Sequence, residues 1–150
     1  MALASVLSYF QSFIPGSRLV DGGDCLNLAK LLFTPTTGIV ALAGGGQAGA
    51  TQLQQGMNRV DTAGAGGTDS VVLPPAIAGS FVVVNNNSGQ AIQVFGIGAN
   101  AGGGQSTGDT IATSSSNTQV ATGTGISLAN TKIAIFYCFI NGQWKELLTA

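Results

Sequence analysis

Short runs of β-branched and aromatic residues, separated by clusters of glycine and small polar residues, make up the chain from Gly38 onward. This spacing is typical of an all-β sandwich or barrel, in which each strand is followed by a turn. The pattern predicts strands at residues 39–43, 52–60, 69–73, 80–85, 92–96, 110–111, 118–121, 126–128, 132–140 and 143–148. We therefore expect an all-β fold, with an antiparallel, jelly-roll-like β-sandwich domain over residues 38–150.

Two pairs of predicted strands have the sequence of a hairpin. Asn141-Gly142, the dipeptide that best forms a two-residue hairpin turn, separates the apolar run 132–140 from the return strand 143–148. The almost continuous apolar character of 132–140 predicts burial on both faces. Turn-forming residues at 85–90 join the runs 80–84 and 92–95, which predicts a second hairpin.

Residues 1–37 have a different pattern, and we expect them to form an N-terminal arm with one or two short helices. Apolar residues recur at helical spacing from Leu3 to Ile14, before Pro15-Gly16. A second short helix is expected from Cys25 to Phe33, with Asp24 as its cap and Thr34-Pro35 as its end. Such an arm either docks on a neighbouring subunit or packs beneath its own sheet.

Charged side chains are scarce. They make up 7% of the 150 residues, and the net charge is −1, whereas an ordinary globular protein has roughly a quarter of its residues charged. Weak self-repulsion favours association between chains. The basic residues are scattered, so no nucleic-acid partner is expected. No apolar stretch approaches the roughly 18 to 20 residues of a membrane helix, and the first residues lack the positive charge of a secretory leader, so no membrane partner is expected either.

The residue types offer little for catalysis. The chain has no histidine, which removes Ser-His-Asp and Cys-His chemistry and the commonest metal ligand, so we expect no catalytic residue, metal or cofactor. The aspartates fall in or beside predicted turns, where a carboxylate accepts hydrogen bonds from backbone amides. A glycosidase pair drawn from Asp69, Asp109 and Glu146 is the alternative, because distant carboxylates can converge in a fold.

Four further features are interpreted as structural. Residues 44–49 match G-x-G-x-x-G, but no helix is expected directly afterwards, so a turn is favoured over a dinucleotide site. Asn86-Asn87-Ser88 matches a glycosylation sequon and is interpreted as a turn. Cys25 and Cys138 are expected to be buried free thiols, with a disulfide between them as the alternative. Trp144 and the aromatic residues at 136, 137 and 139 are expected in the core rather than around a ligand groove.

Several short strings resemble a pattern common in small structural proteins of tailed bacteriophages. They are Asp69-Ser-Val-Val-Leu-Pro74, Gly79-Ser-Phe-Val-Val-Val-Asn85, Gln93-Val-Phe95, Gly108-Asp-Thr-Ile111 and Gly142-Gln-Trp144, with 43–48 and 50–53 upstream. The family that these strings resemble is that of capsid decoration, or cement, proteins. The likeness covers about the last two thirds of the chain and includes no catalytic signature.

The resemblance implies a structural virion protein that binds the major capsid protein on the outside of the head shell, assembles in the host cytoplasm, and forms a homotrimer. The apolar residues of the arm are the candidate capsid or subunit contacts: Phe10, Phe13, Ile14, Leu31, Leu32 and Phe33. The alternative is a tail-fibre or spike receptor-binding domain. Because residues 96–125 contain no aromatic residue, decoration is favoured over adhesion. A polysaccharide-degrading enzyme ranks last.

Overall fold

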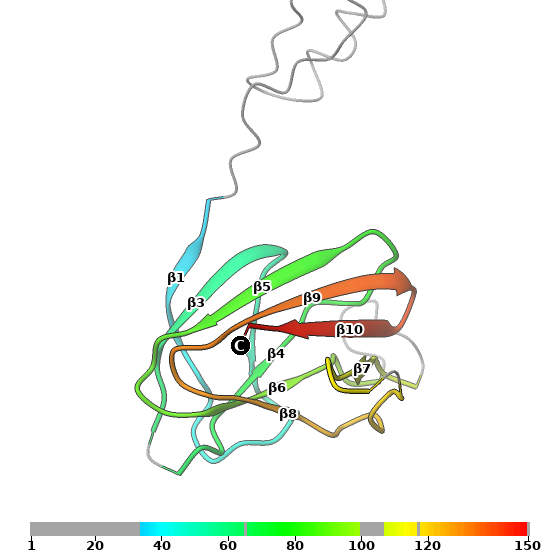
Figure 1. Cartoon of the computed structure of the whole chain (residues 1–150). Coiled ribbons are helices and arrows are strands. Elements are labelled where there is room, and N and C mark those ends of the chain that lie inside the picture. The colour runs from blue at the N-terminus through cyan, green and yellow to red at the C-terminus, as the bar shows by residue number, and fades with distance from the viewer. Residues whose placement is uncertain (1–33, 65, 100–106, 117, 150) are drawn as a thin grey trace, which may run out of the picture. The chain divides into compact units, whose positions relative to one another are not determined.

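The computed structural model describes residues 34–64, 66–99, 107–116 and 118–149 (Figure 1). All of the regular secondary structure in these ranges is β-strand, which confirms the all-β prediction. The strands are β1 (Thr36–Val40), β2 (Thr51–Gln52), β3 (Gly56–Thr62), β4 (Ser70–Val72), β5 (Phe81–Asn86), β6 (Ile92–Phe95), β7 (Thr110–Ala112), β8 (Ile126–Leu128), β9 (Ile133–Ile140) and β10 (Gln143–Leu148). In these ranges no helix could cross a membrane.

The strands form two sheets, and the chain alternates between them. One sheet has six strands in the order β1-β3-β5-β9-β10-β7, and the other has four in the order β2-β4-β6-β8. Figure 1 shows β3, β5, β9 and β10 in one layer and β4, β6 and β8 in the other. From β1 to β8, each strand is followed by a strand of the opposite sheet, so the chain winds around the space between the sheets.

This winding makes most neighbouring strands parallel. Five of the eight strand pairings are parallel (β1–β3, β3–β5, β2–β4, β4–β6 and β7–β10). The expected antiparallel arrangement is therefore wrong for these pairs, and a jelly-roll order is not confirmed. Antiparallel pairing is confined to β5–β9, β9–β10 and β6–β8. Successive windings differ in length, since Thr51 lies opposite Val71 but Gly56 lies opposite Val82.

One apolar core lies between the two sheets. It takes Val82, Val84 and Phe136 from the six-stranded sheet and Val71 and Val94 from the four-stranded sheet, all at most 1% exposed. Burial alternates along β5 and β9, so each of these strands buries every second residue and turns the others outward. The prediction that residues 132–140 are buried on both faces is therefore wrong: Phe139 is 81% exposed.

The two hairpin predictions have opposite outcomes. β9 and β10 pair as an antiparallel hairpin around Asn141-Gly142, with Gly142 at a φ of 81°. β5 and β6 do not pair with each other, because they belong to different sheets. The buried side chain of Asn86 holds this crossing: its Nδ2 donates to the carbonyl oxygens of Gln90 (2.8 Å) and Leu128 (2.9 Å). A residue interpreted as part of a hairpin turn thus joins one sheet to the other.

The remaining boundaries differ from the predicted ones in small ways. β1 begins at Thr36, two residues before the expected domain start at Gly38. The predicted strand 52–60 is two strands, β2 and β3, separated by three residues. The predicted strand 118–121 is reduced to a single bridge between Gln119 and Ala112. Residues 1–33 of the expected arm 1–37, and with them both expected helices, lie outside the described residues.

Candidate functional site

The outer face of the six-stranded sheet is apolar across its centre. A row of four cross-strand neighbours runs over it, from Met57 on β3 through Val83 on β5 and Ile135 on β9 to Leu147 on β10. Met57 is 44% exposed and Leu147 56% exposed, and the two residues between them are partly buried. Apolar side chains that share one exposed face in this way commonly mark an interaction surface.

A second row of outward residues, next to the first, is aromatic. Phe81 on β5 lies opposite Tyr137 on β9, and Tyr137 lies opposite Lys145 on β10. The Tyr137 ring packs edge-to-face against Phe139, with 5.1 Å between the ring centroids and 73° between the ring planes. We call the outward side chains of β3, β5, β9 and β10 together the outer face.

The charged residues at the β3 end of the outer face neutralise each other. The Nε of Arg59 donates to Asp61 Oδ1 (2.6 Å), and the backbone amide of Gly38 donates to Asp61 Oδ2 (2.7 Å). The bond from Arg59, followed by the bond from Gly38, lowers the pKa of Asp61 below its ordinary value of 3.8. Both donors favour the ionised carboxylate, so this end of the face carries an ion pair whose two charges compensate each other.

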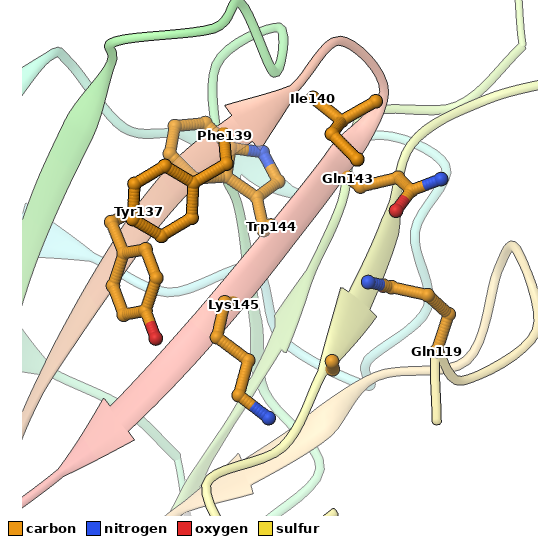
Figure 2. A pocket seen from close by; sticks show the side chains of 8 residues that line it. Gln119, Tyr137, Phe139, Ile140, Gln143, Trp144 and Lys145 are labelled. Carbon is orange, nitrogen blue, oxygen red and sulfur yellow. The ribbon is translucent and has the colours of Figure 1, made fainter. Parts of the chain in front are cut away.

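A pocket of about 320 Å³ lies where the outer face meets the β9–β10 turn (Figure 2). Its lining combines aromatic, aliphatic and amide groups, from Ala112, Gln119, Tyr137, Phe139, Ile140, Gln143, Trp144 and Lys145. Figure 2 shows the rings of Tyr137 and Phe139 side by side on β9, with the Gln119 side chain directed toward β10 from the neighbouring segment. An exposed aromatic ring beside two amide side chains can stack on a ligand and hydrogen-bond to it.

Two consecutive residues of β10 hold the segment that borders this pocket. The ammonium group of Lys145 donates to the carbonyl oxygens of Thr113 (2.9 Å) and Ser116 (2.6 Å). The next residue, Glu146, turns inward and accepts a hydrogen bond from the Ser114 amide (3.0 Å). Because neighbouring residues of a strand point to opposite faces, β10 fixes this segment from both sides.

The carboxylates that could have formed a glycosidase pair are bonded to backbone amides. Asp69 accepts hydrogen bonds from the amides of Gly44 and Gly64, and Asp109 accepts one from the amide of Ala76 (2.6 Å). The two aspartates thus match the predicted use of aspartates as acceptors of backbone hydrogen bonds. Glu146, for which no such role was predicted, is bonded in the same way to the Ser114 amide. Across residues 34–149, leaving out the undescribed positions, no group of three or more His, Cys, Asp or Glu could hold a metal ion.

The glycine motif at 44–49 forms turns, as expected. Gly44, Gly45, Gly46 and Gly49 all have positive φ, and the chain then enters β2 rather than a helix. A Cβ at Gly45 would collide with the carbonyl oxygen of Thr68, so this position requires glycine. A dinucleotide pyrophosphate needs the amides at the start of a helix, which this segment does not supply.

The sequon and the described cysteine are both buried. Asn86 is 0% exposed, so its side chain serves the crossing between the sheets rather than carrying a glycan. Cys138 is a free thiol whose burial raises its pKa above the ordinary value of 9.0. Cys25 lies outside the described residues, and so do all six predicted contacts, Phe10, Phe13, Ile14, Leu31, Leu32 and Phe33.

The aromatic residues near the C-terminus divide between core and surface. Phe136 and Trp144 are fully buried, as expected, whereas Tyr137 and Phe139 belong to the outer face. The outer face was therefore not predicted from the sequence, because both alternating sets of side chains in residues 133–139 are apolar and the pattern does not distinguish the exposed set from the buried one. No protein-family model, no curated protein and no solved structure matches this chain.

Proposed function

We propose that this protein is a structural subunit of a virus particle: a capsid decoration, or cement, protein that binds the outside of the head shell and stabilises it. The observation that carries the proposal is the exposed apolar outer face. A side chain such as Phe139, 81% exposed, is exposed to water in a lone chain and becomes buried when a protein partner covers it.

The scarcity of charge supports the same proposal. With 7% charged residues and a net charge of −1, the surface offers little repulsion between subunits packed at high density on a shell. The carboxylates of the described part are bonded to backbone amides, so we assign no catalytic role to them. The proposed partners are the major capsid protein and further copies of the chain, as a homotrimer on the capsid exterior assembled in the host cytoplasm.

Shell binding by such a subunit would be multivalent. Several weak contacts made by linked copies add through effective concentration, so a single copy need not bind strongly. The arm residues Phe10, Phe13, Ile14, Leu31, Leu32 and Phe33 are the proposed contacts with the shell. The jelly-roll order that the strand pattern predicted is not needed for this role, because binding depends on the surface and not on the strand order.

A receptor-binding domain of a tail fibre or spike is the second candidate, and one observation favours it. The pocket beside the β9–β10 turn combines the exposed ring of Phe139 with the amides of Gln119 and Gln143. Aromatic rings stack on the apolar faces of sugars, and amides bond to hydroxyl groups. This candidate predicts that Phe139→Ser abolishes binding to a host-surface polysaccharide.

Co-sedimentation with undecorated phage heads tests the first candidate. Wild type is expected to sediment with heads until the sites are saturated. The double variant Phe10→Ser/Phe13→Ser is expected to lose this binding, whereas Val40→Ser serves as a control at an exposed apolar residue outside both the arm and the outer face. Failure of the wild type to sediment with heads, together with saturable binding to the polysaccharide, would replace the decoration role by the receptor-binding role.

A further inference from the structure

We propose that the outer face of the six-stranded sheet is the surface through which one copy of this chain binds another. The inference rests on the proposed function, which requires copies to associate, and it adds the surface that they use. The occupant to which we commit is a second copy of the same chain.

The free sheet edges are poorly suited to this contact. The edge strand β1 is interrupted by two register shifts against β3, and the amide of Gly38 in its middle is bonded to Asp61. At the opposite edge, β7 has three residues, and Ala112 is bridged to Gln119. In the other sheet the edge strands β2 and β8 have two and three residues. Short and irregular edge strands protect against edge-to-edge pairing, so the face of the sheet is the surface that remains for contact between copies.

The charge of the outer face permits contact with its own copy. Arg59 is paired with Asp61, and the ammonium group of Lys145 is bonded to two carbonyl oxygens of its own chain. A surface with a strong net charge would repel an identical surface, whereas this one presents the uncharged row Met57-Val83-Ile135-Leu147 to a copy. Two such faces can pack about 10 Å apart, as in any pair of stacked sheets.

The size of the face sets the expected strength. Strands lie about 4.8 Å apart, and residues on one face recur about every 6.8 Å, so each outward residue covers about 33 Å². β3, β5, β9 and β10 carry thirteen outward positions, which together give a flat footprint of about 420 Å². This footprint is about half of the roughly 800 Å² per partner of a standard stable interface, and smaller interfaces are typical of transient contacts. We therefore expect reversible rather than permanent association.

Sedimentation of the full-length chain from about 0.1 to 500 μM, a range that extends below and above a micromolar midpoint, tests this inference with two matched variants. Leu147, in the apolar row, and Val40, on the edge strand β1, are both 56% exposed. Leu147→Glu is expected to raise the concentration at which chains associate by at least tenfold, and Val40→Glu is expected to leave it unchanged. Met57→Glu, at the other end of the row, should act like Leu147→Glu. Urea unfolding of each variant is the control that checks whether the fold is intact.

The outcomes separate the inference from the function that it rests on. Association that survives Leu147→Glu but is lost in Val40→Glu overturns the face in favour of the edge. A wild type that stays monomeric at every concentration, yet sediments with phage heads, overturns contact between copies and leaves the decoration role standing. If Leu147→Glu then also abolishes sedimentation with heads, the occupant of the face is the shell. A wild type that stays monomeric and does not bind to heads contradicts both proposals.

Discussion

Replacing Asn86 by alanine should destabilise the fold far more than replacing its neighbour Asn85. Asn86 is 0% exposed, and its Nδ2 donates to the carbonyl oxygens of Gln90 and Leu128, at 2.8 and 2.9 Å. Its Oδ1 accepts from the amide (3.2 Å) and hydroxyl (2.7 Å) of Ser88. Alanine would leave the carbonyl oxygen of Leu128 without its buried side-chain donor, at about 1 to 3 kcal/mol, whereas the exposed Gln90 still accepts from the Ser88 hydroxyl (3.1 Å). We therefore expect a loss of about 2 kcal/mol.

Urea unfolding followed by tryptophan fluorescence measures this loss, because Trp144 is the only tryptophan and is fully buried. Asn85→Ala is the matched control, since Asn85 points outward from the same strand and should change stability by no more than about 0.5 kcal/mol. Equal effects of the two substitutions, or a loss below about 1 kcal/mol for Asn86→Ala, would refute the view that this side chain holds the crossing between the sheets.

Three further predictions test other parts of the fold. Gly45→Ala should cost more than about 2 kcal/mol, because it combines a positive φ with a backbone collision, whereas Gly46→Ala has open space and should cost about 1 kcal/mol; urea midpoints that do not differ would contradict this. The lowered pKa of Asp61 means that its ion pair stabilises the fold above pH 3.8 and that this contribution is lost as the pH falls through the lower folded-state value. Asp61→Asn should therefore unfold with a weaker dependence on pH in that range, and an unchanged acid-unfolding curve would count against the pair. In a Cys25→Ser background, Cys138 should react with a thiol reagent only after urea unfolding, because it is buried; rapid labelling of the folded chain would be inconsistent with this position.

Local signals located most of the strands but not their partners. The strand 143–148 and its turn at Asn141-Gly142 were predicted correctly, because a two-residue turn fixes the partner strand. The connection from β5 to β6 contains similar turn-forming residues, yet it crosses to the other sheet. Its direction depends on Asn86 bonding to Leu128, forty-two residues away, which no local pattern contains.

The outer face was also not predictable from local sequence patterns. In residues 133–139 both alternating sets of side chains are apolar, so periodicity predicts burial of both. Only the arrangement of the sheets shows that the set with Ala134, Phe136 and Cys138 meets the core, while Tyr137 and Phe139 meet none of it. By contrast, the role of Asp69 in holding turns followed from its type and its glycine neighbours alone.

The measurement that bears most directly on the structural role is the mass of the purified chain by light scattering, alone and after mixing with undecorated phage heads. We expect a mass that rises with concentration above the 14.9 kDa of one chain, and addition of the protein to heads until saturation. A particle that stays at the mass of one chain and adds nothing to the heads would contradict the proposed structural role.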